Sequence, residues 1–270
     1  MSAGVKRAMV NERITGFTGS PIALDELIER ERVSAAKAIE VAFLHDIRVA
    51  ISRVGEINKI ASARITAASQ VATAKAATEA EVSAATLAAY AHEAIAQLKR
   101  RASGMLHVPE DVNALILATS GMANEKISGH AIEAINVIES EAKAAVEEIK
   151  NYGLDAISRI KSLSDETTAE IDKNARQALE KLSLLKAKPR VAQEVIQHAS
   201  EAEALLVGQF KSFKVNIDNL VTHSEKEMIA LAEQCVGEVS AAVSAAENRI
   251  NESRDKAIET INSYAGLVHK

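Results

Sequence analysis

The chain has 270 residues, of which 47% are hydrophobic but only 3% aromatic, with no Trp, 3 Pro and 11 Gly. Its 37 acidic and 32 basic residues give a net charge of −5, which indicates neither a nucleic-acid-binding surface nor an acidic disordered tail. Because a rounded core takes much of its buried area from aromatic side chains, this composition favours closely packed helices.

Residues 1–24 are predicted to form an irregular N-terminal arm, since several glycines and a proline interrupt any periodicity there. Long stretches of helical periodicity follow and are separated by two short breaks. We therefore predict a single helical domain over residues 25–270. The expected helices are 25–102, 109–188 and 189–266.

The two breaks differ in strength. Gly104 suits the position after a helix end, and Pro109 suits the first turn of the next helix. Pro189 stands without a glycine, so it marks either a hairpin turn or a kink. Each helix would be about 115 Å long at 1.5 Å per residue. These equal lengths predict an all-α fold, with three very long helices in an antiparallel hairpin-like bundle or coiled coil, shaped as an elongated rod.

An eleven-residue repeat of large aliphatic residues runs through the second helix. Eleven residues over three turns is close to the period of a straight helix, so such a row stays on one face and is predicted to be buried. Neighbouring rows at the same spacing consist of small residues, mostly Ala, and suit close helix contact. The aliphatic row is Ile116, Ile127, Ile138, Ile149, Ile160, Ile171 and Leu182.

The third helix repeats the period in a new phase. Its predicted packing row is Leu184, Val195, Leu206, Ile217, Met228, Val239, Ile250 and Ile261. The first helix carries two rows on well-separated faces. One row is Phe43, Val54, Ile65, Ala76, Leu87 and Leu98, and the other is Val49, Ile60, Val71 and Val82.

Residues 71–96 of the first helix are apolar nearly all round. A helix of this kind is normally buried on every side, which two partner helices cannot provide. We therefore expect these residues, including Val71, Val82 and Leu87, to lie between subunits of a homo-oligomer or filament.

The sequence contains no motif for phosphate binding, nucleophilic catalysis or metal binding, so neither an enzyme nor a cofactor is predicted. The seven histidines form no pairs at helical spacing. Cys235, the only cysteine, lies in a row of small residues and is predicted to be a buried, unreactive thiol. No signal-peptide pattern and no run of about 18 apolar residues is present, which predicts a cytoplasmic protein without a transmembrane segment.

The repeat quoted above resembles that of hendecad coiled-coil proteins, a class defined by its eleven-residue period. The resemblance covers residues 43–268 and implies an elongated, self-associating rod without a particular activity. In composition alone, as an Ala-rich and Trp-free helical chain, the protein is also similar to phasins, which coat polymer storage granules.

Three functions are compatible with these features. The first is a structural, self-assembling helical scaffold without catalytic activity. The second is an amphipathic coat on a lipid or storage-granule surface, since an eleven-residue repeat gives a nearly straight apolar face. The third and weakest is a membrane-inserting helical toxin, with residues 112–118 as the candidate segment.

Overall fold

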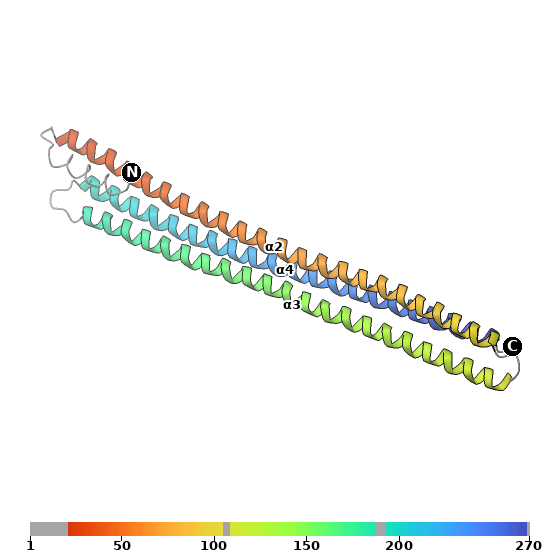
Figure 1. The fold of residues 1–270 in the computed structure, drawn as a ribbon. Helices are drawn as coiled ribbons and strands as arrows, with labels where there is room; N and C mark the ends of the chain where they lie inside the picture. The colour runs from red at the N-terminus through yellow and green to blue at the C-terminus, as the bar shows by residue number, and fades with distance from the viewer. Residues whose placement is uncertain (1–20, 105–108, 187–192, 269–270) are drawn as a thin grey trace. The chain divides into compact units, whose positions relative to one another are not determined.

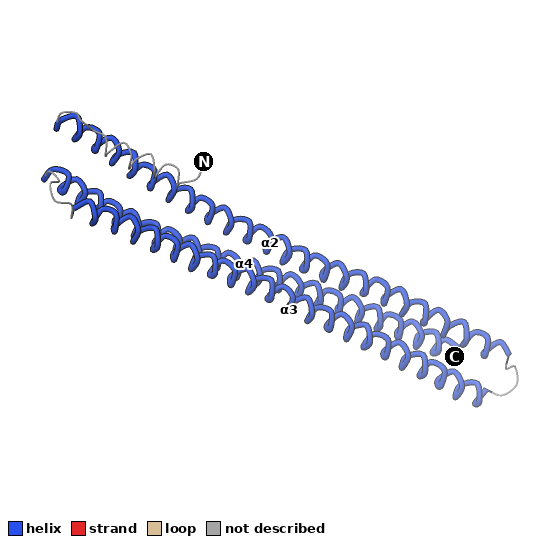
Figure 2. The backbone as a smooth tube through the Cα atoms, turned by 60° about the vertical axis from the view of Figure 1, so that its left-hand side comes forward, coloured by secondary structure: helices blue, strands red, loops and turns tan. Residues whose placement is uncertain are grey.

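The computed structural model describes residues 21–104, 109–186 and 193–268, and all of them are helical. The helices are α2 (Pro21–Gly104), α3 (Pro109–Lys186) and α4 (Gln193–Val268) (Figures 1 and 2). The predicted all-α class with three long helices is therefore confirmed, and these three ranges contain no strand.

The helix bounds lie within four residues of the predicted ones, with the largest differences at the starts of α2 and α4. Residues 21–24 were predicted to be irregular, which is wrong, because α2 already begins at Pro21. Proline is well tolerated at a first helical position, where its missing N–H would have no partner in any case. Residues 1–20, the rest of the predicted arm, lie outside the described residues.

Polar contacts between the helices establish their directions. Residues later in α2 contact residues earlier in α3, so this pair is antiparallel, as are α3 and α4, whereas α4 runs parallel to α2. The break predicted at Pro189 therefore separates two helices of opposite direction and is not a kink within one helix. The contacts are Lys75–Glu141 and Arg101–Thr119 for α2 and α3, Asn124–Asn262 for α3 and α4, and Asn58–Ser224 and Glu81–Arg249 for α2 and α4.

The tertiary contacts divide the chain into two compact units, whereas the sequence predicted one domain over 25–270. Unit 1 combines residues up to Val54 with Lys161–Val221, and unit 2 combines Gly55–Ile160 with Thr222 onwards. Each unit contains one segment of each helix, because all three helices continue from one unit into the other.

The core of unit 2 is a continuous series of large aliphatic residues surrounded by Ala. Each helix contributes about one Ile, Leu, Val or Met every three turns, and the small residues between them let the helices approach closely. Gly153 illustrates this fit, since a Cβ atom there would lie 3.8 Å from the Cβ of Ala232. The largest fully buried side chains of this unit are Ile65, Leu87, Leu98, Ile116, Ile127, Ile149, Ile160, Val239, Ile250 and Ile261.

The core of unit 1 is smaller among the side chains that the structure describes. It brings together Ile47 of α2, Ile171 and Ala175 of α3, and Phe210 and Ile217 of α4. A salt bridge of 2.6 Å between Asp172 and Lys214 joins α3 to α4 beside this cluster. Unit 1 therefore continues the same eleven-residue rows, with an aromatic side chain added.

Candidate interaction surface

The aliphatic rows of α3 and α4 lie in the interior. Ten members expose 5% of their surface or less, and most of these expose 2% or less. They are Ile116, Ile127, Ile138, Ile149, Ile160 and Ile171 of α3, and Ile217, Met228, Val239 and Ile250 of α4. Leu87 of α2 was predicted to lie between subunits, which is wrong, because it is already fully buried within the chain against α3 and α4. These residues hold the helices together within each unit.

Other members of the predicted rows are exposed, half-buried or have side chains outside the described residues. Leu184, placed at the head of the third row, lies in α3 and is 61% exposed, so the row does not extend to it. Leu184 keeps the eleven-residue spacing of the α4 row but belongs to α3. Because the chain reverses direction between these helices, a residue with that spacing points to a different side on α3. The side chains of Phe43, Leu182 and Val195 lie outside the described residues, and Leu206 is half-buried.

The two apolar rows of α2 differ in burial. Val54, Ile65, Ala76, Leu87 and Leu98 face α3 and α4 and are buried. The second row lies on a well-separated side of the helix, where no described helix covers its members from Ile60 to Val82. Its members Ile60, Val71 and Val82 are 49%, 57% and 55% exposed, and Val49 is half-buried.

Small side chains surround this exposed row and complete a continuous surface on α2. We call it the α2 outer face; it consists of Ile60, Ala67, Val71, Ala74, Thr78, Val82, Ala85, Ala89 and Ala96. Apart from the half-buried Ala96, these residues are exposed. The sequence indicated Val71, Val82 and most of the alanines, but it missed Ala67 and Thr78.

One edge of the α2 outer face borders α3 along an open groove of about 460 Å³. Ala67, Ala68 and Val71 of α2 line it opposite Ala144 and Ala145 of α3. Charged and aromatic side chains close its ends: Arg64 lies 5.6 Å from the centre of the Tyr152 ring, and Lys75 pairs with Glu141 at 3.6 Å. The Tyr152 hydroxyl donates to Glu148, and this hydrogen bond raises the pKa of the tyrosine.

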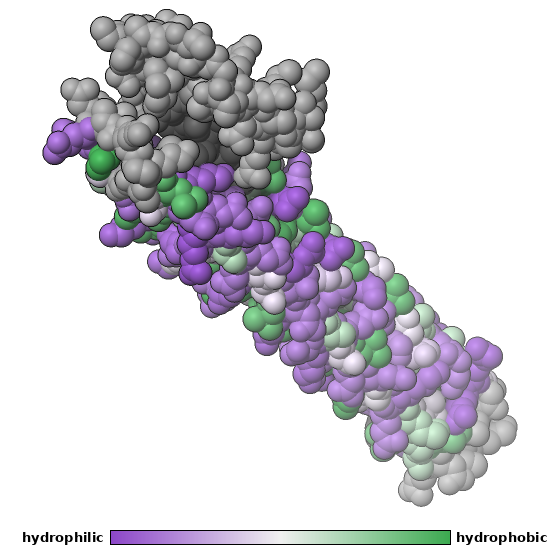
Figure 3. Space-filling view, turned by 90° about the vertical axis from the view of Figure 1, so that its left-hand side faces the viewer, coloured by the Kyte–Doolittle hydropathy of each residue, from purple (hydrophilic) through white to green (hydrophobic). Residues whose placement is uncertain are grey.

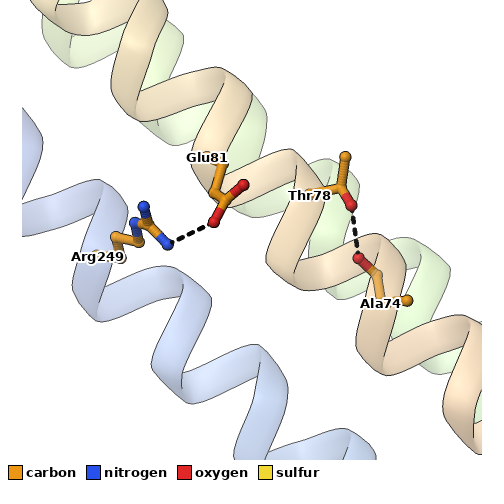
Figure 4. A network of polar contacts seen from close by, with 4 residues as sticks. All are labelled: Ala74, Thr78, Glu81 and Arg249. Carbon is orange, nitrogen blue, oxygen red and sulfur yellow. Dashed lines mark hydrogen bonds and ion pairs between the residues drawn. The ribbon is translucent and has the colours of Figure 1, made fainter.

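The other edge borders α4 and is marked by the ion pair between Glu81 and Arg249, at 3.1 Å (Figure 4). Close to it, the hydroxyl of Thr78 donates to the backbone oxygen of Ala74, 2.9 Å away, within α2. The hydroxyl is thus satisfied by its own helix. Thr78 therefore adds little polarity to a face that is otherwise Ala, Val and Ile.

Hydrophobic residues on the surface of α3 are more scattered. Figure 3 shows isolated hydrophobic residues among hydrophilic ones on the visible side. On α3, Leu117, Met122, Ile132 and Leu154 are each more than half exposed. Exposed charged residues separate them along the helix, among them Glu125, Lys126, Glu133 and Lys143. Single exposed apolar residues of this kind are normal on protein surfaces.

Chemically reactive groups do not converge anywhere in the described residues. Within those ranges, no group of three or more His, Cys, Asp or Glu is arranged to hold a metal ion. Cys235 is 2% exposed, and burial raises the pKa of its thiol, which disfavours the reactive thiolate. His130 is half-buried and forms a T-shaped ring contact with Tyr90.

Several polar residues join the helices, a role that periodicity alone did not reveal. Asn58 of α2 donates to Ser224 of α4, and the hydroxyl of the buried Ser69 lies within hydrogen-bonding distance of both Glu238 and the backbone oxygen of Cys235. Such contacts fix the axial register of one helix against another, because a shift along the helix axis would leave a buried polar atom without a partner. Asn or Ser within an otherwise aliphatic face is the signal that could have found them.

One described helix segment, Ser200–Gly266, is long and apolar enough to cross a membrane by length and composition. No such segment was predicted from the sequence, which has no uninterrupted run of about 18 apolar residues. The stretch that qualifies is 18 residues long, lies within Ser200–Gly266 and contains at most two charged residues. Of that apolar stretch, 17% is buried. A core helix of a soluble protein passes the same test, so the finding points neither to a membrane nor to the cytoplasm.

Comparisons with known proteins support the fold alone. No protein-family model matches the chain, and no curated protein matches it. Among solved structures, a computationally designed three-helix bundle is similar, with a TM-score of 0.55 and 13% sequence identity. The match covers 84% of this chain and 96% of that chain. The class that fold and surface define is therefore a helical bundle of three long helices.

Proposed function

We propose that the protein is a structural, self-assembling helical scaffold without catalytic activity. The observation that carries this proposal is the α2 outer face, where Ile60, Val71 and Val82 are about half exposed among alanines. A buried row already joins α2 to its two partners within the chain. A second apolar row on the opposite side is therefore superfluous for folding one chain, and it is suited to contact with another.

The energetics indicate a modest affinity. Completing the burial of a half-exposed Ile or Val contributes roughly 1 kcal/mol, so six such residues from two chains give about 6 kcal/mol. Association costs an estimated 4–15 kcal/mol before any contact is counted. We therefore expect assembly that depends on protein concentration and is reinforced by contacts beyond these residues.

Light scattering across a series of protein concentrations tests the proposal. The mass should rise with concentration for the natural sequence and should not rise for Val71→Lys. The matched control is Ile132→Lys on α3, because Val71 and Ile132 are both 57% exposed and β-branched. A monomeric mass for the natural protein at high micromolar concentration would rule out the scaffold function.

The second candidate is an amphipathic coat on a lipid or storage-granule surface. It is favoured by the apolar stretch of α4, of which only 17% is buried. Flotation with lipid vesicles separates the two functions. Vesicle binding that Val71→Lys leaves intact would favour the coat, and self-association without flotation would favour the scaffold.

A further inference from the structure

We propose that the α2 outer face binds the same face of a second copy of this chain, antiparallel, about a two-fold axis at Thr78. This inference rests on the proposed self-assembly and names its partner surface and its register. Such a symmetric contact uses one patch twice, so the patch must be complementary to itself. Residues equally far before and after position 78 then lie opposite each other.

The side-chain volumes along the α2 outer face are complementary to those of the same face on the second copy in this arrangement. Each large side chain meets a small one: Val71 lies opposite Ala85, Val82 opposite Ala74, and Ile60 opposite Ala96. Ala67 meets Ala89, and Thr78 meets itself at the axis. A large residue against a small one lets two helices approach closely without a void, as the core of unit 2 already does.

The charges at the ends are complementary on the edge that faces α3. Arg64 contacts the Tyr152 ring of α3, and Glu93 lines a groove with Thr119 and Met122 of the same helix. A two-fold axis at Thr78 places Arg64 within one residue of Glu93 of the second copy. The axis generates this opposite-charge contact twice.

The edge that faces α4 carries a second opposite-charge contact. Lys99 lies over the Tyr264 ring of α4, at 5.5 Å. Glu56 precedes Glu81 by close to seven helical turns, so it shares the edge where Glu81 pairs with Arg249. The same axis brings Glu56 within one residue of Lys99 of the second copy.

The charges distinguish this register from its neighbours. Because the row repeats every eleven residues, a slide of the partner by that length again places large residues opposite small ones. Such a slide moves Glu93 away from Arg64 and Glu56 away from Lys99. Between these ends, the exposed charged residues of α2 from 65 to 92 are Lys75 and Glu81, which pair within the chain with Glu141 and Arg249.

Cysteine cross-linking tests the position of the axis in the full-length protein. Under mild oxidation, Thr78→Cys should form a disulfide-linked dimer at least about ten times faster than Leu154→Cys, a position on α3 that is also exposed. Ala67→Cys and Ala89→Cys should each react slowly alone but quickly when mixed. The natural Cys235 is buried, so the unsubstituted protein should remain without a cross-link.

A charge exchange tests the register independently. Arg64→Glu should weaken dimerisation about 10-fold at low salt, since it creates two like-charge contacts per dimer. Adding Glu93→Arg to the same chain should restore the affinity of the natural sequence. Lys143→Glu on α3, whose side chain lines a groove with Val239 and Val243 of α4, should leave the affinity within about twofold.

The outcomes separate this inference from the proposed function. If the natural protein self-associates but Thr78→Cys reacts no faster than Leu154→Cys, the two-fold contact is wrong and the scaffold function stands. If Ala67→Cys alone reacts as quickly as the mixture, the register is wrong. A strictly monomeric natural protein overturns both proposals.

Discussion

The outer faces of α2 and α3 in unit 2 differ sharply, although both helices bury one aliphatic row at the same eleven-residue period. Over residues 65–92, α2 exposes two charged side chains, Lys75 and Glu81, and both have partners within the chain. Over residues 122–149, α3 exposes seven: Glu125, Lys126, Glu133, Glu141, Lys143, Glu147 and Glu148.

This difference shows that an eleven-residue period specifies helix packing only on a face where the repeated residues are apolar. The outer side of α3 meets the solvent with charges, and its exposed Ile132 and Leu154 are isolated. The outer side of α2 repeats Ile or Val with Ala and thus presents a second packing surface. The four predictions below test this contrast, from the largest expected effect to the smallest.

The largest effect is expected inside α3, between its buried row and its outer face. Ile149→Asp places a charge at a fully buried position in the cluster with Ile65 and Val239, and should cost about 3–5 kcal/mol of unfolding free energy. Leu154→Asp, at a 65% exposed position, should change it by less than about 0.5 kcal/mol. Urea unfolding followed by circular dichroism measures both, and equal midpoints would contradict the assignment of the buried row.

The second prediction concerns the small residues between the large ones. Ala156 is 2% exposed, so Ala156→Leu should overpack the bundle and cost about 1–3 kcal/mol. Ala144→Leu, at an exposed position of the same helix, serves as the control and should be nearly neutral. A stabilised Ala156→Leu variant, or one that binds vesicles more tightly, would argue against close helix packing at this row.

The third prediction tests how closely α3 approaches its neighbours. A Cβ at Gly153 would meet Ala232 at 3.8 Å and Ile65 at 4.0 Å, which is ordinary contact. Gly153→Ala should therefore stabilise the protein by about 0.5–1 kcal/mol, since alanine favours the helix and loses less backbone entropy. Gly153→Leu has no room to fit and should lower the melting temperature, whereas a rise for both variants would indicate looser packing.

The smallest effect separates the two outer faces directly. If α2 mediates self-association, each tenfold rise in protein concentration should add up to about 0.7 kcal/mol of stability per chain by mass action. Calorimetry should then show a melting temperature that rises with concentration. Val71→Glu combined with Val82→Glu should abolish this rise, and Ile132→Glu should keep it. A dependence that survives the double substitution would place the interface elsewhere.

The interior of α3 shows how far a sequence determines such a bundle. The row from Ile116 to Ile171 could be read without any structure, because a period near that of the helix keeps its members on one side. Gly104 and Pro109 likewise predicted the break between the first two helices, because the backbone preferences of Gly and Pro depend on local residues alone. The start at Pro21 was missed, because proline is compatible with both a loop and a first helical position.

Only the tertiary structure decided which of the two apolar rows of α2 lies inside. The sequence marks Leu87 and Val82 equally as apolar and periodic, yet Leu87 is fully buried and Val82 is 55% exposed. The reason is physical: two partner helices cover only part of a helix's circumference, so one row must remain uncovered. Which row they cover depends on the joint fit of all three helices, through contacts such as Asn58–Ser224 between residues far apart in the chain.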